Sequence, residues 1–147
     1  MRENIQIVSI TMVKEKMLQH EYGSKMSSPN DTVEIFRKFI GNSDREVLAL
    51  MSLDTKNKIN ALTVVSIGNL NASIVHPREV FKMAILSNAC SIIICHNHPS
   101  GDSTPSKEDI NISIRLKECG KLLGIELLDH IIIGDEEYTS LKKRGIL

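Results

Sequence analysis

Two histidines and an aspartate in the second half of the chain have the types and spacing of metal ligands. His96 and His98 follow an apolar, β-branched run, Ser91–Cys95, that is typical of a buried strand. In extended backbone, side chains two residues apart point to the same side, so both imidazoles can reach one ion. Asp109 lies in the first turn of the helix expected next. Imidazole nitrogens and a carboxylate oxygen suit zinc, so these three residues are predicted to bind one Zn²⁺ per chain.

Three protein ligands predict a catalytic rather than a structural zinc site. The fourth tetrahedral position stays available to water, whose pKa zinc lowers to about 7. Hydrolysis there also needs a general base near the water and a donor for the developing oxyanion. Glu46 is the candidate base, because a carboxylate that starts an otherwise apolar run needs a reason to be there. Ser106, which opens the helix that carries Asp109, is the candidate oxyanion donor.

Several of these residues have an alternative interpretation. Ser106–Asp109 fits a capping box, in which Ser or Thr precedes an acidic residue by three positions, and this role is compatible with metal binding. The alternative for Glu46 is a solvated carboxylate at the start of a strand, beside Asp44 and Arg45. Asp102 is an alternative carboxylate ligand, although the spacing favours Asp109.

The cysteines and the remaining histidines receive structural predictions. Cys95 directly precedes His96, so on a strand its thiol points to the opposite face and into the core. The other residues of these types are expected to be small buried side chains (Cys90 and Cys119), a helix-start residue (His76) and a strand residue (His130).

The surrounding chain alternates strand and helix patterns that would position the site. Apolar residues recur through Asn4–Val13 as in a first strand, and a polar connector follows over 20–31. The next elements are expected to be a helix over 31–40, strands over 46–53 and 59–67, a helix opening at His76 and Pro77, the strand Ser91–Cys95, a helix over 106–123, a strand over 125–133 and a short helix in the tail. This order predicts an α/β (α+β) fold with a single mixed β-sheet flanked by helices.

Composition and charge narrow the class of protein. A length of 147 residues fits one ordinary domain. Eighteen Lys and Arg residues balance 18 Asp and Glu residues, and only 3% of residues are aromatic, which disfavours nucleic acid as a partner. Three cysteines make no disulfide framework, and no apolar run suits a signal peptide or a membrane span. We therefore expect a cytoplasmic protein without a membrane partner.

The order His-x-His-x7-Ser-x2-Asp, with a Glu upstream, resembles the JAMM (JAB or MPN+) signature of zinc metalloproteases. HNHPSGDSTPSKED at 96–109 is similar to the RadC family, as are LDTKNK at 53–58, VSIGNLNASIVHPREVF at 65–81 and LLGIELLDHIIIG at 122–134. The resemblance implies a RadC-like JAB/MPN domain over 30–147, of cytidine-deaminase-like architecture, after an N-terminal strand and connector over 1–29. It also implies the residue roles: His96, His98 and Asp109 as zinc ligands, Ser106 as oxyanion stabiliser and Glu46 as activator of the zinc-bound water.

Two features depart from the family pattern. Longer RadC proteins carry an N-terminal helical region that resembles a helix-hairpin-helix DNA-binding module, whereas residues 1–29 have the pattern of a strand and a connector. Ser103 stands where many relatives have Pro. The expected function is zinc-dependent hydrolysis of a peptide or isopeptide bond in a protein or peptide substrate. The alternatives are a metal-dependent nuclease associated with DNA repair and a non-catalytic protein-interaction module.

Overall fold

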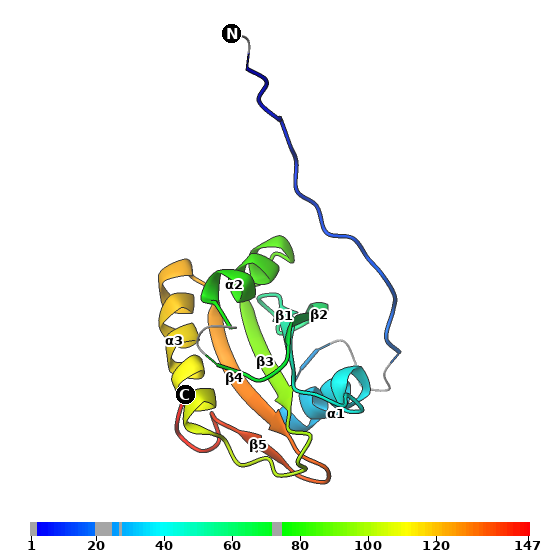
Figure 1. The fold of residues 1–147 in the computed structure, drawn as a ribbon, viewed down its shortest axis with the longest axis vertical. Coiled ribbons are helices and arrows are strands. Elements are labelled where there is room, and N and C mark those ends of the chain that lie inside the picture. Colours follow the sequence, from blue (N-terminus) through cyan, green and yellow to red (C-terminus); the bar gives the residue numbers. More distant parts are fainter. Residues whose placement is uncertain (1–2, 20–24, 27, 72–74) are drawn as a thin grey trace.

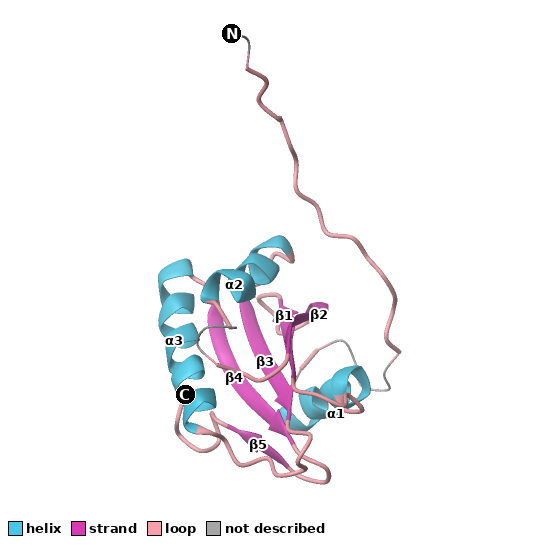
Figure 2. Ribbon diagram, viewed as in Figure 1, coloured by secondary structure: helices cyan, strands magenta, loops and turns pink. Residues whose placement is uncertain are grey.

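The computed structural model describes residues 3–19, 25–26, 28–71 and 75–147 and contains one mixed five-stranded sheet (Figures 1 and 2). Its strand order is β2-β1-β3-β4-β5, in which β3 and β4 are parallel and the other neighbours antiparallel. The strands are β1 (Val47–Leu53), β2 (Ile59–Ile67), β3 (Ser91–Asn97), β4 (Glu126–Ile133) and β5 (Tyr138–Ser140), and the helices are α1 (Pro29–Ile40), α2 (Pro77–Leu86) and α3 (Lys107–Leu123). This arrangement confirms the predicted α+β class with a single mixed sheet flanked by helices.

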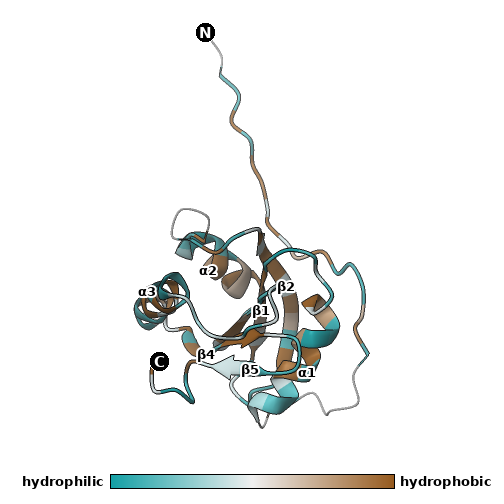
Figure 3. Cartoon of the chain, turned by 60° about the horizontal axis from the view of Figure 1, so that its bottom comes forward, coloured by the Kyte–Doolittle hydropathy of each residue, from teal (hydrophilic) through white to brown (hydrophobic). Residues whose placement is uncertain are grey.

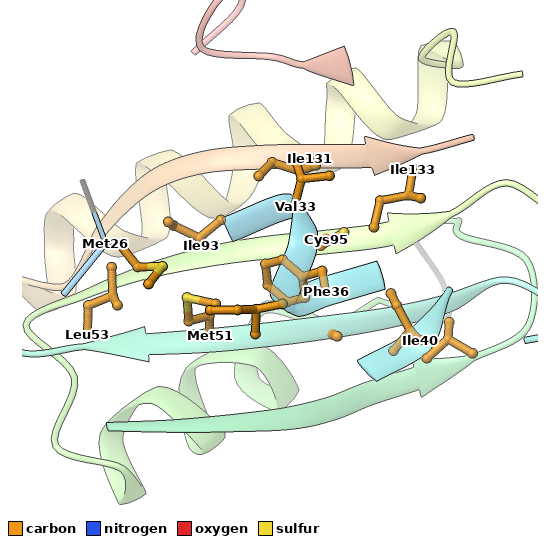
Figure 4. Packing of buried hydrophobic residues seen from close by; sticks show 13 residues of the cluster. Met26, Val33, Phe36, Ile40, Met51, Leu53, Ile93, Cys95, Ile131 and Ile133 are labelled. Carbon is orange, nitrogen blue, oxygen red and sulfur yellow. The ribbon is translucent and has the colours of Figure 1, made fainter. Parts of the chain in front are cut away.

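Helices cover both faces of the central strands. Helix α1 packs on one face and α2 and α3 on the other (Figures 1 and 2). Met51 of β1 belongs to the same buried cluster as Phe36 of α1 (Figure 4), whereas Leu50 belongs to the cluster beneath α2 and α3. Because neither face of β1 or β3 meets solvent, all residues of both strands are buried. The end of β3 is therefore a rigid platform for the residues that follow it.

Capping boxes fix where two helices begin. Ser106 caps α3: its hydroxyl accepts a hydrogen bond from the Asp109 backbone N–H, and the Asp109 carboxylate accepts one from the Ser106 N–H. Ser28 and Asp31 form the same motif at α1, which explains why this helix begins two residues before the predicted position. Helix α3 ends at Gly124, whose φ of 70° is left-handed, as predicted for a glycine that ends a helix.

The tail of the chain differs from the prediction of a short helix. Residues Tyr138–Ser140 form β5, which pairs antiparallel with the end of β4 after a tight turn closed by the Gly134 N–H bond to the Glu137 carbonyl. The pairing satisfies backbone groups of β4 at the edge of the sheet, and local sequence patterns do not encode this long-range requirement.

The N-terminal residues also differ from the prediction of a strand over Asn4–Val13. Residues 3–19 have no strand assignment, and most of them extend away from the sheet (Figure 1). Ile5 and Ile7 are more than nine-tenths exposed, whereas Leu18 packs against the cluster that contains Phe36. Figure 3 shows apolar and polar residues mixed along this segment. The apolar alternation has no neighbouring strand to pair with among the described residues. Part of the predicted connector (20–24 and 27) lies outside the described residues. None of the helices in the described chain has the length and hydropathy needed to cross a bilayer.

Candidate metal centre

The three predicted ligands converge where β3 meets the loop that leads to α3. His96 is in β3, His98 lies one residue beyond its end, and Asp109 is in the first turn of α3. One ligand atom from each residue lies within 4.8 Å of the others, so the group can hold a metal ion. The Nε2 atoms of the two imidazoles are 2.8 Å apart, and the Asp109 oxygens lie 3.4 Å from His96 Nε2 and 3.5 Å from His98 Nε2.

These distances can be compared with the geometry of zinc. A tetrahedral ion with bonds of about 2.0–2.1 Å separates its ligand atoms by about 3.3 Å. Both carboxylate–imidazole distances are close to this value, and the two imidazoles are somewhat closer. His96 and Asp109 are buried, whereas the side chain of His98 is 13% exposed. The group is thus enclosed by protein on one side and reaches solvent at His98.

The loop after β3 is held against the end of β4 by backbone hydrogen bonds. The His98 N–H donates to the Ile133 carbonyl, the Gly101 N–H to the His98 carbonyl, and the Asp135 N–H to the Gly101 carbonyl. Gly101 has φ 87°, which favours glycine, and a Cβ atom at Gly134 would overlap the Gly101 carbonyl oxygen. Two glycines therefore allow the close approach that fixes the position of His98.

The hydrogen bond at the far side of His98 sets which nitrogen faces the site. Its Nδ1 lies 2.7 Å from the backbone carbonyl oxygen of Asp102, and a carbonyl can only accept, so Nδ1 carries the proton. A neutral His98 then directs the lone pair of Nε2 toward His96 and Asp109, the form that binds a metal. The nearby Asp109 carboxylate raises the pKa of His98, against the opposing effect of burial.

Asp109 combines a capping role with its place in the candidate site. Its Oδ2 accepts the Ser106 N–H at 2.7 Å, so the capping box fixes the carboxylate at the start of α3. Burial raises the pKa of Asp109, but the imidazoles of His96 and His98 beside the carboxylate outweigh burial and lower this pKa below its usual range. The carboxylate is therefore ionised and available as an anionic oxygen donor.

His130, which the sequence pattern predicts only as a strand residue, contacts the candidate site. It lies in β4, is fully buried, and its Nε2 is 2.8 Å from the Nδ1 of His96. Burial holds the pKa of His130 well below its usual range, so the ring is neutral. The signal in the sequence was a histidine within an apolar strand, but only the parallel pairing of β3 with β4 shows which residue it meets.

Glu46 and Ser106 flank the three ligands. Glu46 directly precedes β1, whose Leu48 pairs with His96, and its charge contributes to the raised pKa of His98. Its Oε2 also accepts the Leu70 N–H at 3.0 Å, which holds the half-buried carboxylate in place. Ser106 is three residues before Asp109, and its exposed hydroxyl accepts the Asp109 N–H while its own proton remains able to donate elsewhere.

The side chains of Asp102, the alternative ligand, and of the three cysteines lie outside the His-His-Asp group. Asp102 is exposed, and its carboxylate accepts the Thr104 N–H; its backbone, not its side chain, supports His98. Cys95 packs in the α1 cluster, on the face opposite His96, as predicted (Figure 4). The prediction for Cys90 was wrong, because this residue lies exposed at the turn before β3. Cys119 is half-buried.

A cleft of about 570 Å³ opens beside His98. Its walls come from the end of α1, the segment before β1, and the loops after β3 and β4. The polar residues that line it include Arg37, Asn42, Asp44 and Asn97. The guanidinium of Arg37 donates to the backbone carbonyls of Gly134, Asp135 and Glu137, so it ties α1 to the turn before β5.

Comparison with known proteins agrees with the sequence motifs. A UPF0758 protein of Clostridium botulinum strain Hall is 50% identical over 145 residues, which cover 97% of this chain and 64% of the relative. A UPF0758 protein of Clostridium perfringens strain 13 is 55% identical over 123 residues, 84% of this chain and 54% of the relative. The chain thus spans less than two thirds of the length of these curated relatives. Residues 26–146, which include the whole sheet and the His-His-Asp group, match the RadC-like JAB domain model, and the chain belongs to this family.

Proposed function

We propose that the chain is a zinc-dependent hydrolase of the JAMM type that cleaves a peptide or isopeptide bond. The observation that carries this proposal is the convergence of His96 Nε2, His98 Nε2 and the Asp109 carboxylate. The hydrogen bond from His98 Nδ1 to Asp102 leaves the Nε2 lone pair directed at this point. Three electron-rich donors within contact of one another repel unless a proton or a metal ion lies between them, and two imidazoles with one carboxylate are a set that zinc accepts.

The neighbouring residues supply the other roles that hydrolysis requires. When bound, zinc would act as a Lewis acid that polarises a carbonyl and lowers the pKa of a coordinated water. The Glu46 carboxylate takes a proton from the attacking water and transfers it to the leaving amine. The Ser106 hydroxyl donates a hydrogen bond to the carbonyl oxygen as negative charge develops on it. A substrate chain would approach the group from the side of His98, the ligand whose side chain reaches solvent.

Membership of the RadC-like JAB family supports the metal site more directly than it supports a substrate. The relatives carry the name UPF0758 protein, which specifies no reaction. The equal numbers of acidic and basic residues favour a protein or peptide substrate over DNA. A non-catalytic interaction module is the alternative, and it predicts that Glu46 has no effect on any reaction.

The test compares wild type, Glu46→Gln and the control Glu118→Gln, which changes an exposed carboxylate of α3. Each protein is loaded with zinc, its metal content is measured, and it is incubated with linear peptide libraries and with lysine-branched isopeptides analysed by mass spectrometry. We expect all three to hold about one zinc per chain. Cleavage by Glu46→Gln should be slower by about 10²–10⁴-fold, the usual contribution of a general base. The proposal would be overturned if Glu46→Gln and wild type cleaved at equal rates. It would also be overturned if the wild type bound no zinc.

A further inference from the structure

A chain of three hydrogen bonds behind the candidate metal site connects two of its ligands. His96 Nδ1 lies 2.8 Å from His130 Nε2, and His130 Nδ1 lies 2.6 Å from the Ser113 hydroxyl. Ser113, one turn after Asp109 in α3, donates its proton to the Asp109 backbone carbonyl at 2.6 Å. All four residues are buried to 2% exposure or less. The chain therefore runs from β3 through β4 to α3 without contact with solvent.

The carbonyl at one end, together with the neutral state of His130, determines the direction of every hydrogen bond in this chain. A carbonyl oxygen has no proton, so the Ser113 hydroxyl must donate to it. The Ser113 oxygen then receives the Nδ1 proton of His130. A neutral His130 has one ring proton, which leaves its Nε2 as an acceptor for the Nδ1 proton of His96. His96 in turn has no proton on Nε2, the atom that faces His98 and Asp109.

We propose that His130, oriented by Ser113, is a positioning residue that fixes the tautomer and ring orientation of His96 for metal binding. The inference deepens the proposed function and rests on it. Histidine ligands usually donate their second N–H to a carboxylate, a backbone carbonyl or water, and such partners contribute to metal affinity. Here the acceptor is a second imidazole, which has two tautomers of which only one accepts. Ser113 is required because its bond to the Asp109 carbonyl selects that tautomer.

The same chain couples the positions of two ligands. His96 belongs to β3, and Asp109 belongs to α3, which packs against β4. Because Ser113 contacts both His130 and the Asp109 backbone, a shift of α3 relative to β4 would disturb both ligands together.

The first test measures zinc affinity by competition with a chromophoric chelator. The variants are His130→Leu, which removes the acceptor; His130→Gln, whose side-chain oxygen can replace Nε2; and Ser113→Ala. Ile112→Val serves as the control, because it removes one buried methylene beside Ser113 and breaks none of these bonds. We expect His130→Leu to bind zinc about 10–100-fold more weakly than wild type. The zinc affinity of Ser113→Ala should lie between those of His130→Leu and wild type, and His130→Gln should recover most of the wild-type affinity.

Thermal unfolding in the presence of chelator shows whether each variant is folded before zinc is added. Equal zinc affinity in folded His130→Leu and wild type would overturn the inference and leave the proposed function standing. His130→Gln as weak as His130→Leu would also overturn it, since the acceptor would then not be the cause. Zinc binding that depends on His130, without hydrolysis of any substrate, would support the inference and contradict the hydrolase.

A second readout reports the tautomers directly. Long-range ¹H–¹⁵N correlation spectra of zinc-loaded wild type should show His96 and His130 both protonated at Nδ1. Protonation of His130 at Nε2 would overturn the inference, because His96 Nδ1 would then have to accept. A wild type that binds no zinc in the chelator assay overturns both the inference and the proposed function.

Discussion

Single hydrogen bonds decide which atoms of the two histidines face the candidate metal site. Asp102 contributes only its backbone carbonyl, yet this carbonyl determines that His98 presents Nε2 without a proton. Asp109 uses its two oxygens on different histidines and still caps α3. The residue types are visible in the sequence, but the partner of each ring nitrogen depends on how segments distant in the chain pack.

The three cysteines should differ in their rate of alkylation, because the reactivity of a thiol depends on its thiolate content and on its access to solvent. Burial raises the pKa of Cys95 well above its ordinary value, whereas Cys90 is exposed. With iodoacetamide at pH 8 in native buffer, Cys90 should be alkylated first, the half-buried Cys119 more slowly, and Cys95 only after denaturant is added. Peptide mass spectrometry over time measures the three rates. Alkylation of Cys95 as fast as that of Cys90 in the native protein would contradict its place beneath α1.

The capping boxes of α1 and α3 allow helix capping and site chemistry to be separated. Both Ser28 and Ser106 accept the N–H of an aspartate three residues later, but only Ser106 adjoins the candidate site. Ser28→Ala and Ser106→Ala should each lower the free energy of unfolding by about 1 kcal/mol, the usual cost of losing a cap. Chemical denaturation measures this loss.

Only Ser106→Ala should also reduce hydrolysis, because the oxyanion loses a donor; removal of one such donor costs about 10²–10³-fold in rate. Ser106→Thr, which retains a hydroxyl, should recover part of both effects. If Ser28→Ala slows hydrolysis as much as Ser106→Ala does, the loss comes from stability and Ser106 has no role in the reaction.

The loop after β3 packs closely against the end of β4 at Gly101 and Gly134, and this contact should support zinc binding. A Cβ atom at Gly134 would overlap the Gly101 carbonyl, so Gly134→Ala must displace the loop that carries His98 and Asp102. We expect zinc affinity, measured by chelator competition, to fall by about tenfold or more, since disturbed support of a ligand has effects of this size. Unchanged zinc affinity in Gly134→Ala would show that the loop does not position His98.

Sequence patterns predict a helix or strand well where the spacing of apolar residues within the segment already shows which of its faces will be buried. The apolar run of β3 and the helical pattern of α3 are of this kind, and so is the His-x-His spacing at the strand end. The patterns fail where pairing with a distant segment decides the structure. Strand β5 exists through its pairing with β4, and Asn4–Val13 has no strand assignment because no strand among the described residues pairs with it. His130 belongs to the same class, since its contact with His96 arises from the parallel pairing of β3 and β4.

For the whole molecule, the candidate site lies between elements that only the complete fold assembles. β3, α3 and β4 supply the ligands and their support, and the segment before β1 supplies Glu46. A ligand that binds only the assembled site stabilises the folded state, by about 2.7 kcal/mol when its concentration is 100 times the dissociation constant.

Zinc should therefore raise the midpoint of thermal unfolding of the wild type by about 5–10 °C, given a shift of about 2–4 °C per kcal/mol for domains of this size. Chelator should reverse the shift. His98→Ala should show almost none, because it removes one ligand, whereas His76→Asn should respond like wild type, since Asn can still cap α2 away from the site. Differential scanning calorimetry with and without zinc makes the measurement. Zinc at the His-His-Asp group can stabilise the fold in this way only if all three ligands are present. An equal rise of the unfolding midpoint in His98→Ala and wild type would therefore show that the stabilising zinc binds elsewhere.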